Sequence, residues 1–202
     1  MMKHWKHIAV AMSFAFAWAG LAAFAAGATA PSASAKSTAK TMTSEKITMS
    51  DTEFAKAAAE GGYAEVTFGK LAEDKASNKA VKDLAQRMVE DHTKADDELE
   101  TAASKDDISI PSQLNSRDQA TYVRLTQLSG VAFDRAYARD MVRDHETDIA
   151  VFRHEANDGK DTSIKSFAAQ TLPTLEDHLK EARQALQSVS PKTTSVTKKK
   201  SS

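Results

Sequence analysis

Three aspartate–histidine pairs are the residues of this chain whose type and spacing are best suited to bind a ligand. The pairs are Asp91-His92, Asp144-His145 and Asp177-His178. The first two lie in near-repeats, Met88–His92 and Met141–His145, which share four residues of five. Imidazole nitrogens bind zinc, copper and iron in proteins. The three histidines are therefore candidate metal ligands.

A fourth polar residue, Glu65, falls on the apolar stripe of an earlier helical segment. The four residues each lie within about three residues of the middle of a predicted helix: Glu65, His92, His145 and His178. Their heights along the axis of a helical bundle would therefore differ by roughly 5 Å. Four inward polar groups at one depth should meet, and burying them unpaired would cost roughly 1–3 kcal/mol each. One carboxylate and three imidazoles suit one transition metal ion, zinc, copper or iron. The alternative is a core hydrogen-bond network without metal.

Each aspartate of the three pairs is rotated by about 100° from its own histidine on a helix. It therefore points away from that imidazole, and can instead orient a histidine of a neighbouring helix or pair with a basic side chain. We predict that Asp91, Asp144 and Asp177 support the site in this way. Met88 and Met141 stand one turn before a histidine, as copper(I) ligands or as core packing.

Apolar residues at helical spacing predict the elements that hold these groups. The four predicted helices span residues 51–74, 78–103, 131–156 and 163–186, with a helical piece at 119–127. Ser50 and Glu53 form a capping box for the first helix, and Pro173 must kink the last helix or mark its restart at Thr174. The connections are short, long and short. This order predicts an all-α four-helix bundle of ferritin-like up-down topology, in which a long crossover makes the second and third helices parallel.

The ends of the chain predict export. Residues 1–30 carry Lys3 and Lys6, an apolar run and Ala28-Thr29-Ala30, the pattern of a cleaved signal peptide. The alternative is an uncleaved membrane anchor. Residues 31–49 are predicted to be a disordered linker, 50–187 the helical domain and 188–202 a disordered basic tail. The predicted compartment is the periplasm, free or associated with the outer membrane, with no membrane span after cleavage.

The composition and the absence of known motifs exclude several classes of function. The formal charge is −1, which gives no reason to expect nucleic acid as a partner. Cysteine is absent, so disulfides, thiolate ligands and cysteine nucleophiles are excluded. The sequence has no P-loop, dinucleotide fingerprint or HExxH motif, and an enzyme is the last of three hypotheses. The first is a metal-binding module. The second is a structural or stress-related envelope protein, which would contact an envelope partner or a second copy.

Several segments together resemble one family, the domain-of-unknown-function family numbered 4142. They are Glu65–Ala72, Met88–His92, Leu128–Gly130 with Phe133-Asp134, Met141–His145 and Leu172-Pro173 with His178-Leu179. The resemblance covers about residues 50–187 and implies an exported, ferritin-like bundle without an established activity. It points to Glu65, His92, His145 and His178 as recurrent polar positions.

Di-iron ferritin-like proteins carry Glu-x-x-His motifs. Here the residues three positions before the histidines are Val89, Val142 and Leu175. We therefore expect a mononuclear site, or no metal, and not di-iron chemistry.

Overall fold

A computed structural model describes residues 47–191, and this part of the chain contains five α-helices and no strand. The helices are α1 (Asp51–Lys75), α2 (Lys79–Ser104), α3 (Ser116–Thr126), α4 (Gly130–Asp158) and α5 (Thr162–Ser188). The all-α prediction is confirmed. The predicted signal peptide, almost all of the linker and most of the basic tail lie outside the described residues. None of the described helices is long and apolar enough to cross a membrane.

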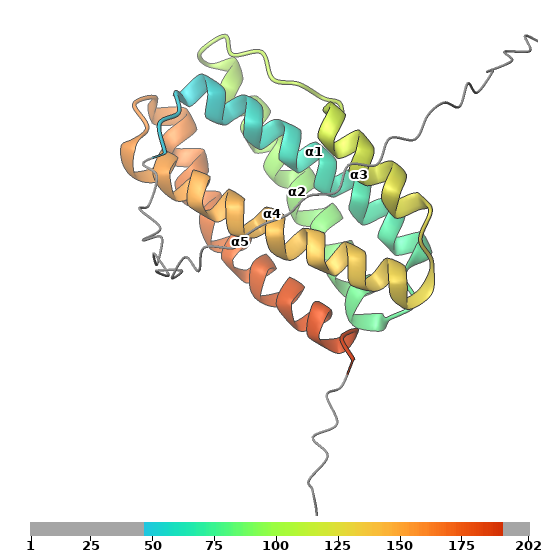
Figure 1. Cartoon of the computed structure of the whole chain (residues 1–202). Helices are drawn as coiled ribbons and strands as arrows, with labels where there is room; N and C mark the ends of the chain where they lie inside the picture. Colours follow the sequence, from blue (N-terminus) through green and yellow to red (C-terminus); the bar gives the residue numbers. More distant parts are fainter. Residues whose placement is uncertain (1–46, 192–202) are drawn as a thin grey trace, which may run out of the picture. The chain divides into compact units, whose positions relative to one another are not determined.

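The four long helices pack as two hairpins, α1 with α2 and α4 with α5, and the hairpins meet through α2 with α5 and α1 with α4 (Figure 1). The ring of Phe54, at the start of α1, lies 4.9 Å from that of Phe152, near the end of α4. These two helices therefore run in opposite directions. Asp134, near the start of α4, accepts hydrogen bonds from Ser77 and Asn78 just before α2. Since α2 and α4 begin at the same end, the segment that joins them runs the length of the domain and contains α3.

Side-chain caps explain where several helices begin. The predicted capping box is confirmed: Ser50 Oγ accepts from the backbone N–H of Glu53, whose carboxylate accepts from the N–H of Ser50. The side chains of Asn78 and Asp161 accept hydrogen bonds from backbone N–H groups in the first turns of α2 and α5. These caps satisfy N–H groups that a helix leaves free in its first turn.

Pro173 does not interrupt α5, which is one continuous helix from Thr162 to Ser188. The predicted restart at Thr174 is wrong. Phe167 before the proline and Leu175 after it are both buried in the same core cluster. Packing on both sides keeps the helix intact although Pro173 cannot donate a backbone hydrogen bond.

The core consists of two apolar clusters at different ends of the helices. One contains Phe68, Met88 and Met141, and the other contains Phe54, Leu99 and Phe167. Along α2, His92 comes between Met88 of the first cluster and Leu99 of the second. Along α4, His145 comes between Met141 and Ile149 in the same way. A polar layer therefore separates the two halves of the core, and Met88 and Met141 belong to apolar packing.

Candidate metal site

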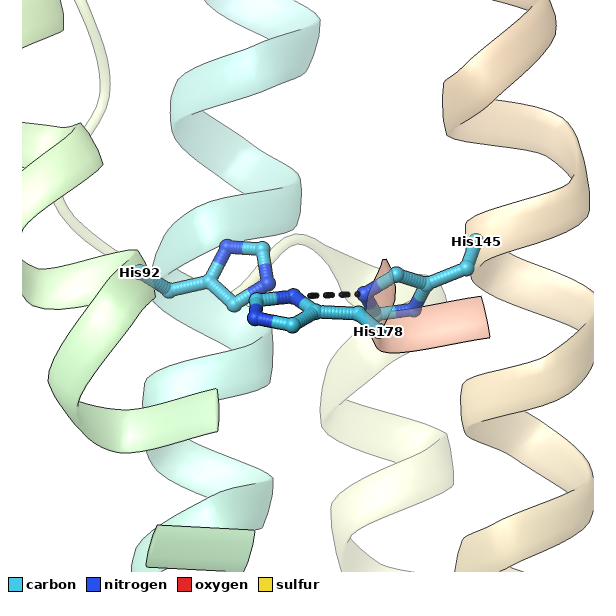
Figure 2. A group of neighbouring side chains, drawn as sticks. All are labelled: His92, His145 and His178. Atoms are coloured by element: carbon cyan, nitrogen blue, oxygen red, sulfur yellow. Dashed lines mark hydrogen bonds between the residues drawn. The ribbon is translucent and has the colours of Figure 1, made fainter. Parts of the chain in front are cut away.

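The polar layer is made by one side chain from each long helix. Glu65 comes from α1, His92 from α2, His145 from α4 and His178 from α5, and their exposed fractions are 3%, 6%, 0% and 1%. Figure 2 shows the three imidazoles turned toward one another. Their ring centroids are 5.2–5.6 Å apart. Helical spacing thus brings together residues that are far apart in the sequence.

Glu65 lies between two of the histidines. Its Oε2 is 2.9 Å from His92 Nε2, and its Oε1 is 3.1 Å from His145 Nδ1. Neither approach is aligned as a hydrogen bond, so Glu65 Oε1 and His92 Nε2 are buried polar atoms without a hydrogen-bond partner among the described residues. Buried polar atoms are normally hydrogen-bonded, so each of these two atoms has the capacity to bind a further group.

The hydrogen bonds around the other two rings fix which nitrogen carries the proton. His145 Nδ1 lies 3.0 Å from the carbonyl oxygen of Met141 and therefore donates to it. His178 Nε2 lies 2.8 Å from Asp91 Oδ2 and donates to that carboxylate. In neutral imidazoles the other nitrogens, His145 Nε2 and His178 Nδ1, then carry lone pairs. These two atoms face each other at 3.3 Å.

The protonation of the layer follows from burial and neighbouring charge. Burial, followed by the proximity of His92, lowers the pKa of His178 to about 4, and burial also lowers the pKa of His145. Both rings are therefore neutral at pH 7, and no proton lies between the two facing nitrogens. Burial opposes a charge on both Glu65 and His92, but it is outweighed for Glu65 by the attraction of His145 and then His92, and for His92 by the attraction of Glu65. The pKa of Glu65 is lowered and that of His92 is raised.

The three aspartates behave differently from one another. Asp91 contacts His178 of a neighbouring helix, as predicted, and also accepts a hydrogen bond from Arg87 Nε at 3.2 Å. Asp144 pairs with Arg117 and Arg143. Asp177 is exposed.

Neither Asp144 nor Asp177 hydrogen-bonds a histidine in the described part of the chain, and Asp144 has the other predicted kind of partner, a basic side chain. Helical rotation turned them away from their own histidines, but it did not bring a second histidine to them.

Two carboxylates that the sequence analysis missed lie beside the layer. Asp96 is one turn after His92, and Asp148 is nearly one turn after His145. Both line a cavity of about 310 Å³ together with Glu65 and His92. Burial raises the pKa of Asp96 to about 6, and burial followed by the charge of Glu65 raises the pKa of Asp148 well above its usual range. Asp96 follows His92 by four residues, and Asp148 follows His145 by three. This spacing puts each aspartate on the same helix face as its histidine and could have predicted its place beside the layer.

Two of the three histidine nitrogens have the spacing of ligands to one metal ion, and the third lies nearby. His92, His145 and His178 each offer one nitrogen, and these three atoms lie within 4.8 Å of one another. Two nitrogens bound at 2.0–2.1 Å to a tetrahedral zinc ion would be about 3.3 Å apart. That is the distance between His145 Nε2 and His178 Nδ1. A cation between these two atoms would face both lone pairs, while Glu65 Oε1 lies against the other nitrogen of the His145 ring, Nδ1.

The fold and the site define a helical protein with a buried layer of three histidines and one glutamate. The chain belongs to the family described as a domain of unknown function (DUF4142), which matches residues 34–185. No curated protein matches the sequence. A solved structure titled "CopM in the Cu(II)-bound form" is similar to this chain with a TM-score of 0.60 and 15% identity. The match covers 70% of this chain and 99% of the other. At this identity the likeness shows a shared helical fold.

Proposed function

We propose that this protein binds one transition metal ion through His92, His145 and His178, with Glu65 as the neighbouring carboxylate. The observation that carries the proposal is the pair of facing lone pairs on His145 Nε2 and His178 Nδ1, 3.3 Å apart. Two such atoms repel each other unless a cation lies between them. A hydrogen-bond network without metal would place a proton there, and the lowered pKa values of both rings oppose it.

The donor set favours copper(II) or zinc as the ions to test first. Imidazole binds both strongly, and three histidines with one carboxylate match the ligand types of mononuclear zinc sites. The structurally similar CopM is described as binding copper(II), which supports copper as the first probe. Glu65 would offset the charge of the ion, and Asp91 would hold the His178 ring in the required orientation.

Topology and location belong to the same proposal. The packing of α1 with α2 and α4, and the long segment between α2 and α4, support a ferritin-like four-helix bundle to which α3 is an addition. The leader-like residues 1–30 support export to the periplasm, where an envelope protein or a second copy would be the partner.

Metal analysis of protein purified without a His tag tests the proposal. After incubation with copper(II) or zinc and removal of the excess, we expect about one ion per chain for the wild type. The double variant His145→Asn/His178→Asn should retain less than about 0.1 ion per chain. His154→Asn is the matched control, because His154 lies on α4 but pairs with Asp158 at 3.0 Å, away from the cluster. A wild type that binds no ion while remaining folded would support the structural alternative.

A further inference from the structure

The cavity of about 310 Å³ beside Glu65 and His92 is lined by many more carboxyl groups than basic groups. Six carboxylates and one guanidinium line it. The carboxylates are those of Glu60, Glu65, Asp96, Asp118, Asp144 and Asp148, and the guanidinium is that of Arg117. The cavity is bounded by residues of all five helices. It therefore joins the polar layer to the surface where α3 lies.

These carboxyl groups differ in their basic partners. Asp144 lies 3.4 Å from Arg117 and 3.2 Å from Arg143, and both arginine side chains are more than half exposed. Asp96 and Asp148 have no ion pair with Lys or Arg among the described residues. A cation that enters the cavity would therefore meet two carboxyl groups whose oxygens are not held by a basic side chain.

A glycine gives the Asp96 carboxylate its place. A Cβ added at Gly62 would lie 2.0 Å from Asp96 Oδ1, whereas a Cβ at Gly61 would meet nothing within 4 Å. The absence of a side chain at position 62 thus lets the carboxylate pack against α1, one turn before Glu65. At the inner end of the cavity lie the two buried atoms without a hydrogen-bond partner, Glu65 Oε1 and His92 Nε2.

The second cavity that reaches the histidines lacks this excess. It has a volume of about 200 Å³ and is lined by Asp91, Glu98 and Lys94, together with His92 and His178. Lys94 lies 3.7 Å from Glu98, and Asp91 is bonded to Arg87 and His178. Each carboxylate there already faces a cationic or donor group.

We propose that Asp96 and Asp148, together with Asp118 and Asp144, form an acidic vestibule through which hydrated divalent cations reach the histidines. The vestibule holds the ion weakly through oxygen ligands before the imidazoles replace its water. This inference rests on the proposed function for the destination of the ion, but the vestibule has a cation affinity of its own. Hard, oxygen-preferring Mn²⁺ is therefore a suitable separate probe.

The first experiment uses paramagnetic broadening of amide NMR signals by Mn²⁺ in the wild type, Asp96→Asn/Asp148→Asn and His145→Asn/His178→Asn. We expect broadening centred on residues 96 and 148 in the wild type and in the histidine variant, and its loss in the aspartate variant. Broadening spread evenly over surface carboxylates, or unchanged in the aspartate variant, would overturn the vestibule. This outcome does not depend on whether the histidines bind metal.

The second experiment measures copper(II) uptake by stopped-flow quenching of tyrosine fluorescence. Asp96→Asn/Asp148→Asn should slow association about 10-fold or more at low ionic strength and flatten its salt dependence. Glu98→Gln, at the second cavity, should match the wild type. If the wild type takes up one ion per chain but Glu98→Gln is the slow variant, the entry route is wrong and the histidine site stands. If Mn²⁺ binds at the vestibule but no ion reaches the histidines, the proposed function fails and the vestibule stands.

Discussion

Asp91→Asn tests whether the bond between Asp91 and His178 prepares the site for metal. The carboxylate accepts from His178 Nε2 at 2.8 Å, which keeps the lone pair on Nδ1 facing His145. An amide in its place is nearly the same size, but it accepts more weakly and can also donate. Loss of such a supporting contact typically costs 10–100-fold in metal affinity, or about 1.4–2.7 kcal/mol.

The structure provides two matched controls for this variant. Asp144 and Asp177 also precede a site histidine in the sequence, but neither contacts one: Asp144 pairs with arginines and Asp177 is exposed. Asp177→Asn should leave the affinity within about twofold of the wild type. Asp144→Asn should change it little at equilibrium, since its charge is already compensated by Arg117 and Arg143.

Competition between the protein and a chelator of known affinity gives the dissociation constants of all three variants for copper(II) and zinc. Thermal melts of the metal-free proteins verify that each variant is folded. Equal losses for Asp91→Asn and Asp177→Asn would mean that only net charge matters. No loss for Asp91→Asn would refute the orienting role of this contact.

Three further predictions concern the fold. Gly61→Ala should raise the free energy of unfolding by about 0.5–1 kcal/mol through helix propensity. Gly62→Ala should lose that gain because its methyl group displaces the Asp96 carboxylate. Denaturant titration measures the free energy of unfolding of both variants, and equal gains would contradict the close contact between Gly62 and Asp96. Asp134→Asn should destabilise by about 1–3 kcal/mol, since the fully buried carboxylate accepts three hydrogen bonds from the segment before α2; an unchanged urea midpoint would show that these bonds contribute nothing. Burial and neighbouring carboxylates raise the pKa of Glu155 from 4.5 to about 7, so its contribution to stability is fully present below pH 4.5 and is lost as pH rises to 7. We place this loss of unfolding free energy at about 1–2 kcal/mol after solvent screening, and Glu155→Gln should remove it. Parallel curves of stability against pH for the wild type and the variant would contradict this prediction.

Helical periodicity was sufficient to predict the long helices and the depth of the site. The spacing of Phe54, Phe68, Met88 and Leu99 defines inward faces, and Glu65 and His92 fall on those faces near the helix centres. Because the four residues lie near mid-helix, their common level does not depend on the direction of each helix. The site could therefore be located before the topology was known.

The contacts across helices could not be predicted in the same way. An aspartate contacts a histidine of another helix only if the two helices are neighbours and are rotated suitably about their own axes. The sequence does not define either condition for Asp91, Asp144 or Asp177. Asp144 faces α3. The apolar pattern of α3 is too short to predict where this helix packs on the bundle. The sequence analysis allowed a basic partner for Asp144, but it could not identify Arg117 as that partner.

Pro173 shows the opposite error for one of the two predicted outcomes: the helix does not restart at Thr174, because residues on both sides of the proline pack in the same core cluster.

The central claim is that the polar layer binds one metal ion, and X-ray absorption spectroscopy of the copper- or zinc-loaded, tag-free protein tests it most directly. We predict nitrogen or oxygen neighbours at about 2.0–2.1 Å, with the outer-shell scattering of about three imidazoles. His145→Asn/His178→Asn should lose this signature. A spectrum of oxygen neighbours alone, or one unchanged in the double variant, would contradict the assignment of His92, His145 and His178 as ligands.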